Sequence, residues 1–327
     1  MNKVSASNVG ALFLMKARSQ ALKKYLWGIC YGIFLTAFTV YVMLDTFVIA
    51  RVYSNTSENS GNELDIVLQE EENDSKSKAE PSSVVSDEHS YSDENISITI
   101  QEYREYDTTI YVADVKLSSA EYLKTALAKG TYGKNVTEKT SEMAADNSAI
   151  LAVNGDYYGS QEKGYVLRNG ILYRNIADRN QEDLVIYKDG SFGIINESEI
   201  SADTLAGNNA EQILSFGPAL VIDGEISVTE DEEVGKARSS NPRTAIGIID
   251  ELHYVFVVSD GRTNESQGLS LFELAEFMTN LDVEIVYNLD GGGSSTMVFN
   301  GKVINNPTSN GKSIKERSVS DIVYIGY

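Results

Sequence analysis

The segment Asn288–Thr296 gathers residue types that can do chemistry: one carboxylate, three consecutive glycines and three hydroxyls. It follows the apolar run Val283–Tyr287, which predicts a buried strand. Three glycines in a row are costly for structure alone, because glycine loses much conformational entropy on folding and packs no side chain. They let backbone N–H groups approach a ligand, and hydroxyls add donors suited to phosphate or sugar oxygens. The residues are Asp290, Gly291, Gly292, Gly293, Ser294, Ser295 and Thr296.

This glycine-rich segment has two interpretations. The glycines alone fit a tight connection as well as a ligand site, and Asp290 at the strand end favours the site. The segment is not a P-loop, because no Gly-Lys-Ser/Thr ends it. The residues that follow, 296–304, predict a hairpin around Asn300-Gly301 in place of the P-loop helix.

Three further apolar strands end in polar clusters, at Asn154–Tyr158, Asn241–Gly247 and Ser259–Arg262. Strands that end in Asp, Arg and Gly place these groups at a rim, where ligand sites are usually assembled. We therefore expect the four clusters to meet at one site.

The elements that must position these clusters are mostly strands. Alternating or apolar runs predict strands over 96–100, 109–115, 149–153, 219–222, 244–249, 252–258 and 320–325. Helices are predicted over 119–128, 137–145 and 270–281, and hairpin turns at 169–170, 189–190 and 223–224. The fold class is α+β, a single β-rich mixed domain with a few helices.

The N-terminal part of the chain has a different composition. Residues 1–25 are basic, and the run Leu26–Leu44 contains no charge, which predicts a transmembrane anchor over 26–50. The basic flank predicts a cytoplasmic N-terminus and an extracytoplasmic remainder. A cleaved signal peptide is the alternative, but the site around Ala50 is a poor cleavage site. Residues 51–95 are rich in Ser, Asn and Glu and predict an acidic disordered linker before a domain over 96–327.

Charge and rare residues exclude several function classes. Residues 96–327 carry a net charge of −16 without a basic run, which argues against a nucleic-acid partner. Cys30 is the only cysteine and lies in the apolar run, so the domain has no thiolate nucleophile and no disulfide. His89 and His253 lie in the linker and in an apolar strand, which gives little support for a Ser-His-Asp triad or a zinc site.

No cofactor is predicted. A divalent cation held by Asp156, Asp260 and Asp290 is conceivable, but their spacing matches no known metal loop.

The four clusters and the helix after the third resemble the phosphodiester glycosidase family. At Asn154–Tyr158 the resemblance is weaker, because Asp156 stands where the family commonly has glycine. The family cleaves the glycosidic bond of a sugar-1-phosphodiester and releases the sugar and a phosphomonoester. The segments that match in order and spacing are Arg243–Gly247, Asp260–Arg262, Gly268–Phe277, Asn288–Thr296, Asn306–Pro307 and Arg317–Ser320.

The resemblance implies roles for the polar residues. An oxocarbenium-like transition state needs a carboxylate near C1, and Asp290 is the first choice. Glu273 is the second candidate, although Ser270 and Glu273 also have the spacing of a capping box. Asp260 is expected to act as a base or bind sugar hydroxyls, unless it only starts a turn. The predicted substrate-binding residues are Asn154, Asp156, Arg243, Thr244, Gly291, Gly292, Gly293, Ser294, Ser295 and Arg317, with Arg243 and Arg317 as phosphate clamps.

The leading interpretation is a membrane-anchored extracytoplasmic phosphodiester glycosidase. Its substrate would be a surface glycan or teichoic-type polymer that contains N-acetylhexosamine-type sugar-1-phosphodiesters. The first alternative is a non-catalytic module that binds glycans or assembles exopolysaccharide with the same pocket. The second is a surface structural domain without a site.

Overall fold

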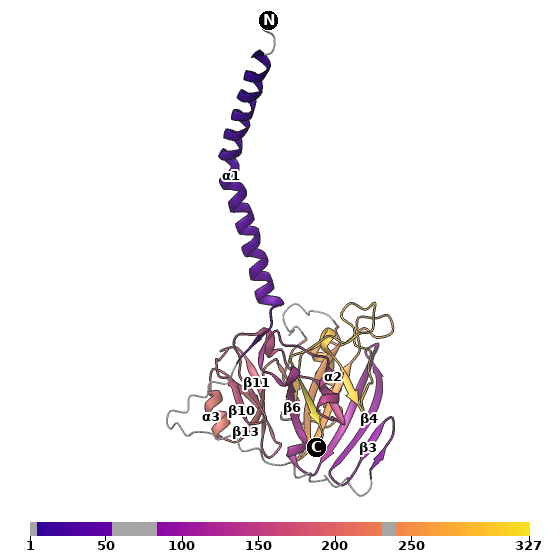
Figure 1. Cartoon of the computed structure of the whole chain (residues 1–327). Coiled ribbons are helices and arrows are strands. Elements are labelled where there is room, and N and C mark those ends of the chain that lie inside the picture. Colours follow the sequence, from indigo (N-terminus) through magenta and orange to yellow (C-terminus); the bar gives the residue numbers. More distant parts are fainter. Residues whose placement is uncertain (1–4, 54–83, 231–239) are drawn as a thin grey trace, which may run out of the picture. The chain divides into compact units, whose positions relative to one another are not determined.

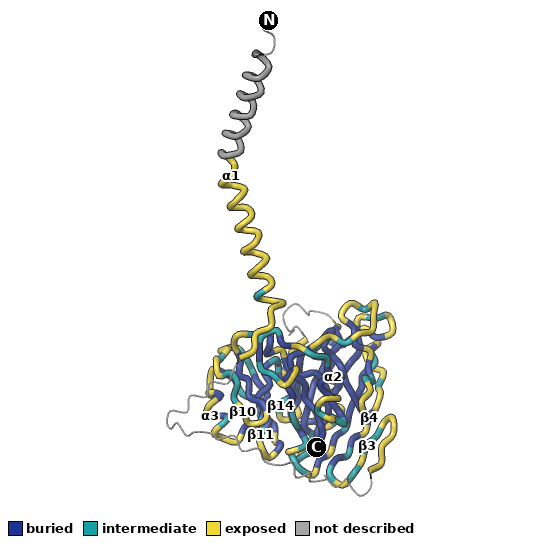
Figure 2. Tube along the Cα trace, viewed as in Figure 1, coloured by how far each residue is buried: buried dark blue, intermediate teal, exposed yellow. Residues whose placement is uncertain are grey.

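The computed structural model describes residues 5–53, 84–230 and 240–327, with the backbone alone for 5–24. The chain divides into two compact units, Met1–Ala50 and Arg51–Tyr327. The first contains helix α1, Ser5–Phe47. Its stretch Tyr25–Phe47, 23 residues with a mean hydropathy of 1.7, is long and apolar enough to cross a membrane, as a signal sequence also can be. The described side chains of α1 are almost all exposed (Figure 2).

A nine-stranded antiparallel sheet forms the centre of the second unit, in the order β15-β14-β18-β16-β17-β5-β4-β3-β2. Its central pairs are long; β5 pairs with β4 from Ile96 to Glu105. The predicted strands at 96–100, 109–115, 219–222, 244–249 and 252–258 all belong to it. The bounds are β2 Val85–Ser86, β3 Ser90–Ser92, β4 Ile96–Glu105, β5 Thr108–Leu117, β14 Ala219–Ile222, β15 Glu225–Ile226, β16 Arg243–Asp250, β17 His253–Ser259 and β18 Ile285–Asn288.

Two five-stranded antiparallel sheets and a two-stranded sheet complete this unit, in the orders β20-β19-β8-β21-β6, β10-β9-β13-β11-β12 and β1-β7. Figure 1 shows β10, β11 and β13 together at one side of the unit and β3 and β4 at the other. The bounds are β1 Arg51–Val52, β6 Leu123–Leu127, β7 Gly133–Lys134, β8 Leu151–Asn154, β9 Val166–Arg168, β10 Ile171–Arg174, β11 Glu182–Tyr187, β12 Phe192–Asn196, β13 Ala210–Leu214, β19 Met297–Phe299, β20 Lys302–Val303 and β21 Asp321–Ile325.

The main core is an apolar cluster to which all three large sheets contribute. Ile98, Phe256 and Tyr287 come from the nine-stranded sheet, Phe299 from β19 and Leu184 from β11. All five are nearly inaccessible to solvent. Burial of aromatic and branched side chains on this scale is the dominant favourable term in folding, and it fixes the three sheets relative to one another.

Three short helices cover the outer faces of the sheets. Helix α4, Leu271–Thr279, packs Leu274, Phe277 and Met278 on the far face of the nine-stranded sheet. Helix α2, Thr140–Asp146, lies against β8 and β21, and helix α3, Ala202–Gly207, against β10 and β13. The 3₁₀ turns are η1 Ala120–Tyr122, η2 Ala128–Gly130, η3 Tyr158–Ser160 and η4 Gly292–Ser294.

The helix predicted over 119–128 is wrong. The chain forms η1 and then strand β6, whose residues pair with β21 from Leu127 to Leu123. The segment has helix-forming residues, but it forms the edge strand of this sheet and buries Leu123 and Leu127. That burial and pairing outweigh local helix propensity. Ser119 does cap the turn, because its side chain accepts a hydrogen bond from the N–H of Glu121.

The predicted linker over 51–95 differs from the structure at both ends. Arg51–Val52 pairs with β7, and Ser90–Ser92 pairs with β4 as an added strand. Residues 54–83 lie outside the described part of the chain. Composition alone missed the ends because an edge strand gains backbone hydrogen bonds without needing many apolar side chains.

Candidate functional site

Asp290 lies just after β18, and two side chains donate hydrogen bonds to one of its carboxylate oxygens, Oδ2. Oδ2 accepts hydrogen bonds from the Ser294 hydroxyl at 2.5 Å and from Nη2 of Arg317 at 3.1 Å. No described side chain donates to Oδ1, and the N–H of Gly291 adds a backbone hydrogen bond to the carboxylate. The residue is 9 % exposed, so the carboxyl is largely removed from water and yet keeps one oxygen for a ligand.

Burial raises the pKa of Asp290 above its ordinary value, because water that would stabilise the charge is excluded. The charge of Arg317 and the hydrogen bonds from Ser294 and Arg317 act in the opposite direction. A carboxyl balanced in this way can stabilise positive charge or exchange a proton, as catalytic carboxyls do.

Asn154 ties three strand ends together behind Asp290. Its side-chain amide donates to the Asp290 carbonyl at 2.5 Å, and its Oδ1 accepts from the hydroxyl of Thr244 at 2.8 Å. Oδ1 also accepts from the N–H of Thr296 at 3.2 Å. The ends of β8, β16 and β18 therefore meet at one fully buried amide, and Asn154, Thr244 and the Asp290 loop converge as the sequence predicted they would.

Both carboxylate oxygens of Asp260 are engaged by the protein. Its Oδ1 accepts from the N–H of Asn306 at 2.7 Å, and Oδ2 accepts from the Asn306 side chain at 2.9 Å. Asn305 connects this carboxylate to the glycine-rich loop, since its Nδ2 donates to Asp260 at 3.3 Å and to the Ser295 carbonyl at 3.0 Å. Asp260 thus supports the glycine-rich loop through Asn305. Its contact with sugar stays a prediction.

Asp156 belongs to a buried ion cluster. Nη2 of Arg168 lies 2.7 Å from Asp156 and 2.7 Å from Asp321, and all three side chains are almost fully buried. The N–H groups of Tyr158 and Ser215 also donate to Asp156. Burial and the neighbouring Asp156 charge raise the pKa of Asp321 to about 7. The cluster anchors the segment that carries Asn154, and both oxygens of Asp156 have protein partners.

Arg243 and Glu273, two further predicted site residues, bond to backbone groups. Arg243, 4 % exposed, donates from Nε to the carbonyl of Leu269 at 2.8 Å. Glu273 closes the capping box of α4, accepting from the N–H of Ser270 at 2.8 Å while the Ser270 hydroxyl accepts from the N–H of Glu273 at 3.1 Å. The phosphate-clamp role of Arg243 and the catalytic role of Glu273 stay predictions.

Gly291, Gly292 and Gly293 are closely covered by neighbouring groups. A Cβ on Gly291 would lie 3.0 Å from the carbonyl oxygen of Pro242, and one on Gly292, where φ is +64°, would lie 2.7 Å from a guanidinium nitrogen of Arg262. Gly293 packs against Ser309. Gly292 is favoured by its left-handed backbone, and a side chain at any of the three positions would require a neighbour to shift.

Sequence reasoning missed the roles of Arg262, Asn305 and Ser309. Arg262 stands inside the Asp260–Arg262 cluster, which was the available signal, and Asn305 precedes the Asn306-Pro307 match. Ser309 carried no signal, because only the folded chain brings it onto the glycine-rich loop.

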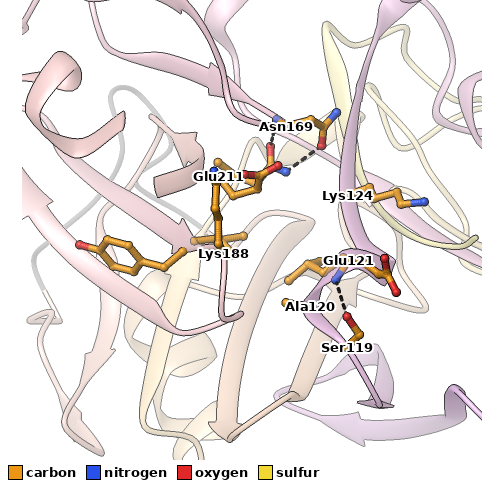
Figure 3. A pocket seen from close by; sticks show the side chains of 11 residues that line it. Ser119, Ala120, Glu121, Lys124, Asn169, Lys188 and Glu211 are labelled. Carbon is orange, nitrogen blue, oxygen red and sulfur yellow. Dashed lines mark hydrogen bonds between the residues drawn. The ribbon is translucent and has the colours of Figure 1, made fainter. Parts of the chain in front are cut away.

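Two cavities lie away from Asp290. One of about 480 Å³ lies between β6, β11 and β13, lined by Lys124, Lys188 and Glu211 among others (Figure 3). Asn169 and Gln212 in its wall bond to each other and to Thr125. The other, of about 570 Å³, is lined by β4, β5 and the β19–β20 hairpin. Neither wall contains a predicted site residue.

The described residues contain no group of three or more His, Cys, Asp or Glu placed to hold a metal ion. The His253 side chain has a hydrogen-bond partner on the neighbouring strand, since Nε2 lies 2.9 Å from the Asp114 carboxylate.

The sequence profile of the phosphodiester glycosidase family matches residues 147–326, more than half of the chain, and the chain therefore belongs to this family. The match includes Asn154, Arg243, Asp260, Asp290 and Arg317.

Particular relatives can also be named. The chain is 31 % identical over 184 residues to N-acetylglucosamine-1-phosphodiester alpha-N-acetylglucosaminidase of Bos taurus, covering 51 % of this chain and 34 % of that protein. It is 28 % identical over 201 residues to the SPbeta prophage-derived uncharacterized protein YomE of Bacillus subtilis (strain 168), covering 60 % of this chain and 31 % of that one. The chain thus spans about a third of the length of these curated relatives.

A solved structure shares the fold. The catalytic domain of zebrafish N-acetylglucosamine-1-phosphodiester alpha-N-acetylglucosaminidase, auto-inhibited by pro-peptide, superposes with a TM-score of 0.57 at 23 % identity. The similarity covers 71 % of this chain and 83 % of that one.

Proposed function

We propose that this protein hydrolyses the glycosidic bond of sugar-1-phosphodiesters with N-acetylhexosamine-type sugars. The observation that carries the proposal is the Asp290 carboxyl, which is nine-tenths buried, is bonded through Oδ2 to Ser294 and Arg317, and has no described side chain as a donor to Oδ1. Membership of the phosphodiester glycosidase family supports the same reaction class.

In the proposed reaction the bond between C1 and the phosphate oxygen breaks, the oxygen of water becomes bonded to C1, and the proton that this water loses passes to the solvent. Oδ1 of Asp290 faces the positive charge that develops at C1 and the ring oxygen. The phosphomonoester leaves with the bond electrons and has a second pKa of about 6, so it needs little protonation. Arg317, whose side chain is 44 % exposed, stabilises the negative charge that accumulates on the departing phosphate.

The other candidate carboxylates take supporting roles in this proposal. Asp156 and Asp260 accept protein hydrogen bonds on both oxygens, and Glu273 caps α4. Asn154 and Thr244 fix the position of the Asp290 backbone.

The proposed location is the outer face of a cell membrane, with α1 as a single-span anchor and a cytoplasmic N-terminus. The length and hydropathy of Tyr25–Phe47 support an anchor, and Lys3, Lys16 and Arg18 support the orientation. Substrates there would be surface glycans or teichoic-type polymers.

The test uses the full-length chain in detergent and the methyl ester of N-acetylglucosamine-1-phosphate. We expect the parent protein to release N-acetylglucosamine and Asp290→Asn to lose about 100-fold or more of that activity. The matched control is Asp282→Asn, which changes an exposed carboxylate in the turn after α4 and leaves activity unchanged. Calorimetry would record binding without turnover if the chain is a glycan-binding module. No sugar release by the parent, or full activity in Asp290→Asn, contradicts the proposal.

A further inference from the structure

Arg262 brings a second guanidinium to the glycine-rich loop. Its backbone has the left-handed φ of +64°, and its Nη2 packs against Gly292, where a Cβ would approach it to 2.7 Å. Arg317 reaches the neighbouring residue, with Nη2 3.4 Å from the carbonyl oxygen of Gly291. Two arginines from different segments therefore contact adjacent residues, Gly291 and Gly292, of one loop.

The two guanidinium groups repel each other. Partial burial of its side chain and the charge of Arg317 lower the pKa of Arg262. Arg317 pairs with Asp290, whereas Arg262 forms no ion pair with any described residue. Arg262 is therefore a guanidinium without a carboxylate partner among the described residues, on a domain whose residues 96–327 carry a net charge of −16. An anion between the two arginines would relieve the repulsion.

Neutral partners hold Arg262 in place. Nε and Nη2 both donate to Oδ1 of Asn241, at 3.2 and 3.1 Å, and Nη1 donates to the carbonyl of Ser309 at 2.8 Å. One N–H on each Nη atom is left over. Nη1 of Arg317 donates to no described residue. Both arginines thus have donors to spare at the exposed side of the loop.

We propose that Arg262 and Arg317 together form a phosphate site that holds the phosphomonoester produced by the reaction proposed above. The inference rests on that function for the origin of the phosphate, but the site itself is defined by the two arginines. Arg262 then takes the phosphate-binding role that sequence reasoning gave to Arg243, whose Nε is committed to Leu269. The site also binds inorganic phosphate, which competes with substrate.

The experiment measures inorganic phosphate binding to the full-length chain in detergent by calorimetry at constant ionic strength. We expect Arg262→Gln and Arg317→Gln each to weaken binding by about tenfold or more, the value of one charge-assisted hydrogen bond. The matched control is Arg179→Gln, which removes the same charge from an exposed loop arginine that forms no hydrogen bond or ion pair with a described residue, and it should bind phosphate like the parent. Arg262→Lys keeps the charge but loses the planar fork, so it should bind with intermediate strength.

The inference is overturned if the parent does not bind phosphate, or if Arg262→Gln binds it as the parent does while melting at the same temperature. If Arg262→Gln does not fold, Arg262→Lys decides: unchanged phosphate affinity in that variant overturns the bidentate site. Phosphate binding that is lost in Arg262→Gln, in a protein that releases no sugar, supports the site and contradicts the proposed function. Sugar release by the parent, together with a phosphate affinity that does not change in Arg262→Gln, supports the proposed function and contradicts the site.

Discussion

Asp290 differs from the other predicted site carboxylates in how its oxygens are used. Asp156 and Asp260 have protein partners on both oxygens, whereas no described side chain donates to Oδ1 of Asp290. Residue type and position at a strand end identified all three as candidates, but several of the hydrogen-bond partners that distinguish Asp290 from the other two come from distant segments. Only the folded chain reveals them.

The pKa of Asp290 gives a prediction about pH dependence. Burial raises this pKa above the ordinary value of 3.8, and Arg317 lowers it. If the reaction needs the ionised carboxylate, kcat/KM falls as pH drops through the pKa of Asp290. Removing the Arg317 charge raises this pKa further, so the acid limb of the profile should move to higher pH in Arg317→Gln.

Measurement of kcat/KM against pH for the parent, Arg317→Gln and the control Arg179→Gln checks this. The control should keep the acid limb of the parent. An acid limb in Arg317→Gln that stays in place or moves to lower pH would mean that another group controls it.

At the level of elements, the glycine-rich loop has a left-handed backbone at Gly292, which favours glycine. Gly292 has a φ of +64°, and a Cβ there would meet Arg262. Gly292→Ala should therefore cost about 1–2 kcal/mol of stability from the left-handed backbone alone. It should also lower sugar release, because Arg262 and the loop must move apart.

Gly301→Ala is the matched control, since Gly301 has a φ of +74° in the β19–β20 turn and open space where a Cβ would be added. Thermal unfolding should show a comparable loss in both variants, with activity reduced only in Gly292→Ala. Equal activity in the two would show that the loop does not need its close packing.

The strand pattern was largely predictable and its exceptions have a common cause. Alternation and turn residues located β4, β5, β16 and β17 and the hairpin at Asn300-Gly301, because these signals are local. Strand β6 was predicted as a helix, and β3 was assigned to the linker. Strand β6 pairs with β21, far away in the sequence, and β3 lies between β4 and the edge strand β2, so pairing decides the conformation of both.

At the scale of the whole molecule, the surfaces of the two units differ in chemical character. The described part of α1 exposes apolar side chains, and residues 96–327 are strongly acidic. The full-length chain should therefore stay with membranes through high-salt and alkaline washes and dissolve only in detergent. In intact cells, external protease should reach the C-terminal domain and spare a tag at the N-terminus. Recovery of the full-length chain without detergent would contradict the anchor.

The central claim is that the bond broken lies between C1 of the sugar and the phosphate oxygen. Hydrolysis of a sugar-1-phosphodiester in ¹⁸O-labelled water, followed by mass spectrometry of the phosphomonoester, tests it most directly. Attack at C1 leaves the phosphomonoester free of label, which is the predicted result. Label in the phosphate product, or sugar-1-phosphate as the sugar product, would mean that water attacks phosphorus and that Asp290 does not serve a glycosidase.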